Sequence, residues 1–218
     1  NLKIFEFIKE NKLPIKYFVP LSSNIFGSSK TKKQNEKSLL NPTSIYGIAK
    51  TSLYHVCNYY RSTYNLKIYN SIFYNHESPR RSEEYVTKKI VKKACSIKIN
   101  NDKKLELGDI NIKIDWGYAK DYVEAAWQIM QLKDPDIFII SSGKLTSVKN
   151  FCKLVFDYLK LDYKKYLKIN KKFIRPSKTS NLFGDFSKAG RVFNYKPKTD
   201  IKKLVKIMVD DELQKYNR

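Results

Sequence analysis

Glycine is scarce in this chain of 218 residues, which has only seven, and no two of them lie closer than six positions apart. A turn that wraps the phosphates of a dinucleotide needs closely spaced glycines between a strand and a helix. The sequence therefore contains no complete dinucleotide-binding unit.

Cysteine and histidine are also rare: the chain has Cys57, Cys95 and Cys152, and only His55 and His76. The cysteines are odd in number and far apart, and none has the spacing of a metal-ligand motif. This pattern argues against a disulfide framework and predicts no bound metal. We interpret the cysteines as small buried hydrophobic residues.

Long apolar runs are absent, since no stretch of about 20 apolar residues indicates a membrane span. The first residues do not follow the basic-then-apolar order of a signal peptide. The composition therefore predicts a soluble, cytoplasmic protein with no membrane partner.

The net charge of +22 raises the alternative of a nucleic-acid-binding protein, because a large basic excess attracts polyanions. Only six of the 43 basic residues are arginine, which is the residue that base and phosphate recognition favours. The lysines are spread through every segment, and no zinc or RNA-binding motif is visible. We therefore expect no nucleic-acid partner and interpret the charge as a general enrichment in lysine.

The hydrophobic pattern predicts alternating helices and strands. Helices are expected at residues 2–12, 43–64, 85–99, 118–132, 147–160 and 200–216, and strands at 16–21, 67–73, 103–107 and 137–141. Residues 76–84 are polar and irregular, which is typical of a binding loop at the carboxyl end of a strand. This order of elements predicts an α/β fold with a parallel sheet.

The predicted helix 43–64 carries a tyrosine and a lysine with a chemical use. Tyr46 and Lys50 lie four residues apart, so their side chains share one face of the helix. A neighbouring ammonium favours the phenolate form of a tyrosine, which can take a proton from a sugar hydroxyl while hydride leaves the same carbon for a nicotinamide. The strand before the helix delivers two more hydroxyls, Ser22 and Ser23. In a chain this rich in Lys and Tyr the spacing also arises by chance, so a solvated helix face is the alternative interpretation.

Residues around this pair, and runs further along, resemble a known family. Residues 41–50 read Asn-Pro-Thr-Ser-Ile-Tyr-Gly-Ile-Ala-Lys, residues 75–81 read Asn-His-Glu-Ser-Pro-Arg-Arg, residues 115–125 read Asp-Trp-Gly-Tyr-Ala-Lys-Asp-Tyr-Val-Glu-Ala, and residues 175–176 read Arg-Pro. On these runs the chain resembles the GDP-mannose 4,6-dehydratases of the extended short-chain dehydrogenase/reductase superfamily. The similarity extends over nearly the whole chain.

The resemblance implies the C-terminal part of a Rossmann-type parallel sheet together with the smaller substrate-binding lobe. Residues 1–76 are expected to form the C-terminal half of an NADP-binding Rossmann domain, and residues 77–218 the lobe that binds a GDP-sugar, with 118–142 packing back on the Rossmann sheet. The first strands of that sheet are expected to be missing, so the chain is interpreted as N-terminally truncated. The resemblance also implies an NADP cofactor, and a homodimer or tetramer built on helix 43–64.

The resemblance assigns roles to individual residues. In the family's reaction the sugar is oxidised at C4, water is eliminated across C5 and C6, and the hydride returns to C6. Ser22 would hold the sugar 4-oxygen, Tyr46 would be the base at that oxygen, and Lys50 would bind the nicotinamide ribose. His76 and Arg81 match cofactor-binding positions. The substrate-binding positions fall on Ser23, Asn75, Val86, Lys89, Lys113 and Arg175.

The chain departs from the family at Asn24, where the family has the Glu that removes the C5 proton and protonates the leaving 6-hydroxyl. An amide has no proton to exchange near neutral pH. Three interpretations remain open: a dehydratase that recruits another acid, with Glu36 and Glu77 as candidates; a reductase or epimerase that acts at C4 without elimination; or a non-catalytic remnant. Ile114 and Lys178 replace an Arg and a Glu of the nucleotide site, which weakens the prediction of GDP as the nucleotide.

Two further groups of residues are expected to support the fold. Trp116, Tyr122 and Trp127 are interpreted as core aromatics. Asp115 and Asp121 are interpreted as supports of the sheet and the nucleotide loop rather than as a pair of catalytic carboxylates.

Overall fold

The computed structural model describes residues 1–29, 33–174 and 182–216, and its first sheet is wholly parallel, in the order β1-β2-β6. The strands are β1 (Tyr17–Ser22), β2 (Ile68–Phe73) and β6 (Ile137–Ile140). Ser22 lies opposite Phe73, and Phe73 lies opposite Ile140. The carboxyl ends of the three strands therefore meet at one edge of the sheet.

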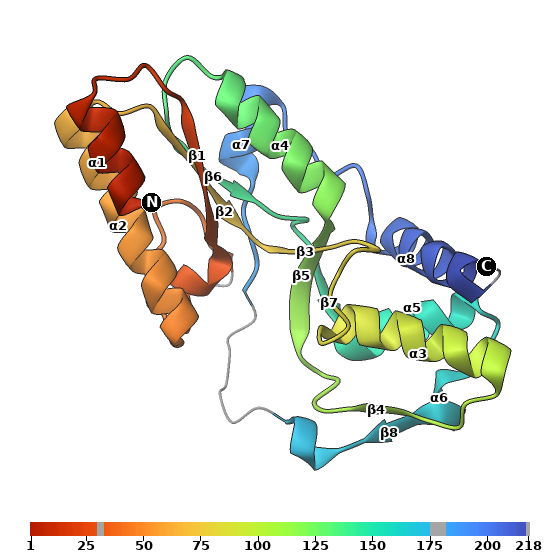
Figure 1. Cartoon of the computed structure of the whole chain (residues 1–218). Helices are drawn as coiled ribbons and strands as arrows, with labels where there is room; N and C mark the ends of the chain where they lie inside the picture. Colours follow the sequence, from red (N-terminus) through yellow and green to blue (C-terminus); the bar gives the residue numbers. More distant parts are fainter. Residues whose placement is uncertain (30–32, 175–181, 217–218) are drawn as a thin grey trace.

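Helices cover both faces of this sheet (Figure 1), with α1 (Leu2–Glu10) and α2 (Ile45–Tyr64) on one face and α4 (Ala119–Gln131) on the other. Five of the six residues of β2 are buried, as expected for a strand covered on both faces. Side chains alternate along a strand, so Ile68 and Ile72 pack on the α2 side and Tyr69 packs on the α4 side.

Local signals set the ends of α2. The Ser44 hydroxyl accepts a hydrogen bond from the Gly47 N–H at 3.0 Å and caps the start of the helix. The helix stops at Asn65, whose φ of 55° is left-handed, a conformation that Asn tolerates. Because both ends are defined, Tyr46 and Lys50 lie in the first two turns.

The second half of the fold, at the lower right of Figure 1, is built around another small sheet and three helices. The sheet has the order β3-β5-β7, with β3 parallel and β7 antiparallel to β5. The elements are β3 (Asn75–Glu77), β5 (Lys113–Tyr118), β7 (Leu145–Ser147), α3 (Val86–Asn100), α5 (Val148–Tyr158) and α8 (Ile201–Tyr216). The three helices share one apolar core with Trp116 of β5.

Shorter elements complete the described residues. A parallel pair, β4 (Leu105–Leu107) and β8 (Leu167–Ile169), lies beside α3. The others are η1 (Ser23–Ile25), α6 (Tyr163–Tyr166), η2 (Lys171–Phe173) and α7 (Ser187–Phe193).

A buried ion pair joins α3 to α8. Lys88 Nζ lies 2.6 Å from Glu212 Oε2, and the two side chains are only 4% and 5% exposed. The same ammonium donates to the Pro79 carbonyl oxygen at 3.0 Å. Helix α8 is thereby tied to the loop that follows β3.

The two outer edges of the first sheet differ. On β6, the Ile139 N–H donates to Glu36 Oε1 at 2.9 Å, and Lys188 Nζ donates to the Ile137 carbonyl at 2.8 Å. Charged side chains of this kind prevent another strand from adding. The outer edge of β1 pairs with no other strand within the described ranges.

The predicted helices and strands are confirmed, with ends that differ by no more than two residues. Four strands, β3, β5, β7 and β8, were not predicted, and residues 75–77 extend where a loop was expected from residue 76. The cysteines are buried as predicted, and burial raises the pKa of the Cys95 and Cys152 thiols to about 12.

One predicted core aromatic is wrong. Trp116 and Tyr122 are buried, but Trp127 is 69% exposed. Helix α4 buries Tyr122, Ala125 and Ile129 against the sheet, which places Trp127 on its opposite side.

No helix in the described part of the chain is long and apolar enough to cross a membrane. No group of three or more His, Cys, Asp or Glu side chains in it is placed to hold a metal ion.

Candidate active site

The predicted hydroxyls lie at the carboxyl end of β1. Ser22 ends the strand, and its Oγ accepts a hydrogen bond from the Asn24 N–H at 3.3 Å. Ser23 is buried, whereas Asn24 is exposed. The η1 turn packs tightly on α2, since a Cβ at Gly47 would lie 2.7 Å from the Asn24 carbonyl oxygen. Only glycine at position 47 allows Asn24 to lie against the first turn of α2.

Tyr46 and Lys50 project from that same part of α2. Lys50 Nζ lies 5.7 Å from the centroid of the Tyr46 ring and donates to the Pro20 carbonyl oxygen at 2.8 Å. Partial burial lowers the pKa of Lys50, because removal from water disfavours the ammonium form. Tyr46 is 53% exposed and open to a ligand. The strand β1, the η1 turn and α2 thus bring Ser22, Asn24, Tyr46 and Lys50 together.

His76 lies at the same edge of the sheet. Its ring is 5.5 Å from the ring of Phe73, the residue opposite Ser22, and 5.0 Å from the ring of Tyr122. Its Nδ1–H donates to the Tyr74 carbonyl oxygen at 2.9 Å, which leaves the Nε2 lone pair as an acceptor. The structure therefore supplies a fixed, partly buried imidazole just beyond the carboxyl end of β2, the strand that pairs with β1.

We predict that His76 titrates below the ordinary histidine value of 6.5. Burial lowers the pKa of His76, the Tyr74 carbonyl opposes this shift, and the Arg81 charge adds to it. Unfolding restores the ordinary value, so the unfolded chain binds the extra proton first as the pH falls. The contribution of neutral His76 to folding is therefore complete above pH 6.5 and is lost as the pH falls towards the folded value.

NMR titration of the imidazole rings tests this prediction. The chain has only one other histidine, His55, which is exposed on α2, so a His55→Gln variant assigns the two signals. A His76 signal that titrates at or above pH 6.5 would contradict the assigned environment.

Arg81 is held by a buried carboxylate. Its Nε lies 3.2 Å from Glu77 Oε2, and the Thr87 hydroxyl donates to the same oxygen at 2.6 Å. The guanidinium carbon lies 3.4 Å from the centroid of the Tyr85 ring. Glu77 is 2% exposed, and burial raises its pKa while Thr87 and Arg81 oppose the shift. Glu77 is therefore a structural partner of Arg81.

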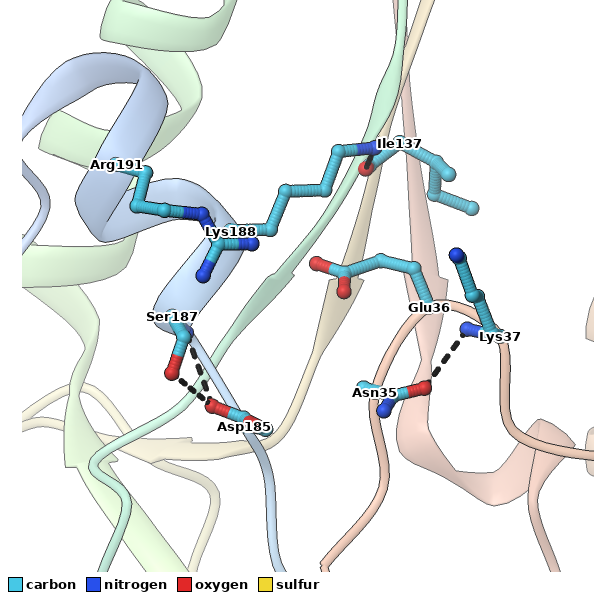
Figure 2. A pocket seen from close by; sticks show the side chains of 8 residues that line it. All are labelled: Asn35, Glu36, Lys37, Ile137, Asp185, Ser187, Lys188 and Arg191. Atoms are coloured by element: carbon cyan, nitrogen blue, oxygen red, sulfur yellow. Dashed lines mark hydrogen bonds between the residues drawn. The ribbon is translucent and has the colours of Figure 1, made fainter.

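Glu36, the other candidate acid, is hydrogen-bonded to the outer edge of β6. Figure 2 shows its side chain in a cavity of about 650 Å³, across from Lys188 and Arg191 of α7. Its carboxylate accepts the Ile139 N–H, as described above. Neither Glu36 nor Glu77 is therefore free to replace the carboxylate missing at Asn24.

The predicted substrate-binding residues lie on the second half of the fold. Asn75 begins β3, and Lys113 begins β5 with its side chain exposed. Val86 and Lys89 are one turn apart in the first turns of α3. Arg175 and Lys178 lie outside the described residues.

Asp115 and Asp121 bind backbone groups of separate segments. Asp115 is buried and accepts hydrogen bonds from the N–H groups of Ser142, Gly143 and Gly184, at 2.8, 3.2 and 3.3 Å. Asp121 accepts from the N–H groups of Lys198 and Thr199, at 3.0 and 2.9 Å. The two carboxylates support the fold, in agreement with the interpretation from sequence.

Comparison with known proteins adds evidence on ancestry. The family model described as GDP-mannose 4,6 dehydratase matches residues 1–208. The chain belongs to the GDP-mannose 4,6-dehydratase family.

Relatives in this dehydratase family are longer than this chain. GDP-mannose 4,6 dehydratase 1 of Arabidopsis thaliana is 40% identical over 209 residues, which cover 96% of this chain and 58% of that protein. GDP-mannose 4,6 dehydratase of Homo sapiens is 33% identical over 222 residues, which cover 93% of this chain and 60% of that protein. The chain thus spans somewhat less than two thirds of the dehydratases that it matches.

Solved structures confirm the predicted fold. RMD from Pseudomonas aeruginosa, complexed with NADPH, matches with a TM-score of 0.88 at 16% identity, over 98% of this chain and 72% of that one. The dTDP-glucose 4,6-dehydratase of Bacillus anthracis, in complex with NAD, matches with a TM-score of 0.86 at 19% identity, over 99% of this chain and 67% of that one. At these identities the likeness establishes the α/β fold of this dehydratase family member and nothing finer.

Proposed function

We propose that this chain is the catalytic and sugar-nucleotide-binding part of an NADP-dependent GDP-mannose 4,6-dehydratase, a lyase that forms GDP-4-keto-6-deoxymannose. The observation that carries the proposal is the position of four side chains at or next to the carboxyl edge of the parallel sheet: Ser22 at the end of β1, Tyr46 and Lys50 on the start of α2 beside it, and His76 after the end of β2. Ligands of open α/β sheets bind at this edge. Membership of the dehydratase family supports the reaction type.

Each residue has one task in this proposal. Ser22 Oγ holds the sugar 4-oxygen, and the Tyr46 phenolate takes the proton of the 4-hydroxyl. Lys50, whose Nζ lies 5.7 Å from the centroid of the Tyr46 ring, would hold the nicotinamide ribose. Bound NADP supplies the acceptor for the C4 hydride and the donor of that hydride to C6. His76 and Arg81 would hold the cofactor.

The residues present fit only one end of NADP. Tyr46, Lys50 and His76 suit the nicotinamide end. The seven glycines are too far apart to form a phosphate-wrapping turn, and the outer edge of β1 is unpaired in the part of the fold that the structure describes. The proposed substrate-binding residues, by contrast, all lie within this chain.

We therefore predict that this chain binds GDP but not NADP. Isothermal titration should give a GDP dissociation constant on the order of 10–100 μM and no heat with NADP at similar concentrations. The Lys89→Ala variant removes a proposed GDP contact from the surface of α3 and should therefore bind GDP more weakly than the wild-type chain. Tight NADP binding would contradict the placement of the cofactor site, and absent GDP binding would favour a non-catalytic remnant.

Asn24 favours a second candidate function, a nucleotide-sugar 4-reductase or epimerase. Hydride transfer at C4 needs Ser22, Tyr46 and Lys50, which are present. Elimination also needs an acid–base group, which the Asn24 amide does not provide. Exchange of the sugar C5 hydrogen with solvent distinguishes the two candidates, because only a dehydratase removes that proton.

We also propose a homodimer or tetramer through α1 and α2. Exposed apolar side chains on these helices include Phe7, which is 59% exposed, and Ile48, which is 49% exposed. Tyr60 of α2 does not belong to this surface, because α1 covers it: Tyr60 is 5% exposed and packs against Phe5 with the ring centroids 5.4 Å apart.

The predicted assembly is testable by sedimentation. Phe7→Asp with Ile48→Asp should convert a dimer into a monomer at tens of micromolar, because two charges would be buried in an apolar contact. Val192→Asp, at a comparably exposed apolar residue of α7, is the control and should leave the dimer intact. A wild-type chain that sediments as a monomer would contradict this surface.

We further propose the division of the chain into residues 1–76 of a Rossmann half and residues 77–218 of a sugar-nucleotide lobe, and a cytoplasmic location. Pairing of β6 with β2, and packing of α4 on that sheet, support the return of residues 118–142 to the first half.

A further inference from the structure

We propose that Phe173 is the nucleobase-stacking residue of the sugar-nucleotide site. The inference rests on the proposed function and adds a residue that determines nucleotide affinity. Its signal in the sequence is an aromatic residue two positions before Arg175, in a segment that sequence patterns alone do not assign.

The backbone of Phe173 is fixed against the end of β4. Its N–H donates to the Asn170 carbonyl at 3.0 Å, and the Asn170 N–H donates to the Leu107 carbonyl at 2.8 Å. The Asn170 amide also donates to Glu106 Oε2 at 3.0 Å. A Cβ at Gly108 would lie 2.5 Å from the Phe173 carbonyl oxygen, so the turn lies directly on position 108. The ring therefore projects from a well-anchored turn.

The ring of Phe173 lies beside the predicted sugar-nucleotide residues. Lys89 Nζ is 4.0 Å from the ring centroid, in cation–π contact. Lys89 and Val86 share one face of α3, because they are three residues apart. The turn after β8 thus brings Phe173 to the face of α3 that carries two proposed substrate contacts, Val86 and Lys89.

Phe173 nevertheless remains 50% exposed. Exposure of an aromatic ring forgoes the hydrophobic free energy that its burial would provide. A nucleobase can cover such a ring by stacking on it, and this contact is worth about 1–3 kcal/mol per base. The Lys89 ammonium at the ring adds a positive charge where a nucleoside diphosphate would bring negative ones.

Titration of the 218-residue chain with GDP and with pyrophosphate tests the inference. Phe173→Ala should weaken GDP binding about 5- to 100-fold and change pyrophosphate binding by less than about twofold, because pyrophosphate has no base. Phe173→Trp restores a flat ring and should retain GDP affinity. Trp127→Ala, which removes an exposed ring from α4, should change neither affinity.

The outcomes separate this inference from the proposed function. If the wild-type chain binds no GDP, the proposed substrate is wrong and the inference fails with it. If the wild type binds GDP and Phe173→Ala binds it equally well, only the stacking role is overturned. An equal loss of GDP and pyrophosphate binding would also overturn it, because the ring would then support the turn rather than the base.

Discussion

Replacement of Asn24 by Glu should raise the rate of the elimination step about 10²- to 10⁴-fold, which is the usual contribution of a placed general acid–base group. Asn24 is exposed at the η1 turn, two residues after Ser22, so a longer carboxylate fits there without repacking. The test uses a chimera in which this chain is joined to the part of the Arabidopsis relative that it does not match, with NADP added. Exchange of the C5 hydrogen of GDP-mannose with solvent deuterium measures the step.

Two variants of the chimera serve as controls for this result. Asn24→Gln has the length of Glu without its proton chemistry and should stay at the wild-type rate. Tyr46→Phe should abolish both C5 exchange and the transient absorbance of reduced nicotinamide, because oxidation at C4 comes first. If the Asn24 chimera already exchanges as fast as its Glu variant, another residue carries the acid–base step and our assignment of position 24 is wrong.

The Lys88→Ala variant should lose about 3–5 kcal/mol of unfolding free energy, which is the usual cost of removing one partner of a buried ion pair. The substitution leaves the Glu212 carboxylate, 5% exposed, without its 2.6 Å partner, and leaves the Pro79 carbonyl without its donor. Lys215 remains 3.0 Å from Glu212 and should keep the loss within this range. Urea denaturation followed by circular dichroism measures the change.

Lys92→Ala is the matched control on the same helix. Lys92 pairs with Glu83 at 2.7 Å, but the two side chains are 45% and 63% exposed, so the loss should stay below about 1 kcal/mol.

Burial raises the pKa of Glu212, but its hydrogen bonds to Lys88 and Lys215 outweigh burial and lower the pKa below 4.5. The contribution of the pair is therefore present above pH 4.5 and is lost as the pH falls through the lowered value. Equal losses of unfolding free energy in Lys88→Ala and Lys92→Ala would show that the Lys88–Glu212 pair does not stabilise the packing of α3 on α8.

Long elements were predictable because each carries its own periodic signal. Helix α2 runs for 20 residues, with a capping Ser44 and a stop at Asn65, and the sequence predicts it within two residues. Strand β5 was missed although Ile114, Trp116 and Tyr118 alternate with other residues, because Asp115 and Gly117 are also buried there. Burial of a carboxylate requires backbone donors from the segments at 142–143 and 184, which no local pattern reveals.

The sequence alone determined that Tyr46 and Lys50 share one face of one helix, because they are four residues apart, and the proposed chemistry of the site rests on this spacing. Family membership likewise follows from runs of residues and needs no coordinates. Only the tertiary structure decided which side chains are available. It removed Glu77 and Glu36 as acids, covered Tyr60 with α1, exposed Trp127 and brought Phe173 to Lys89. Such outcomes depend on contacts between residues far apart in the chain, which the spacing along one element does not encode.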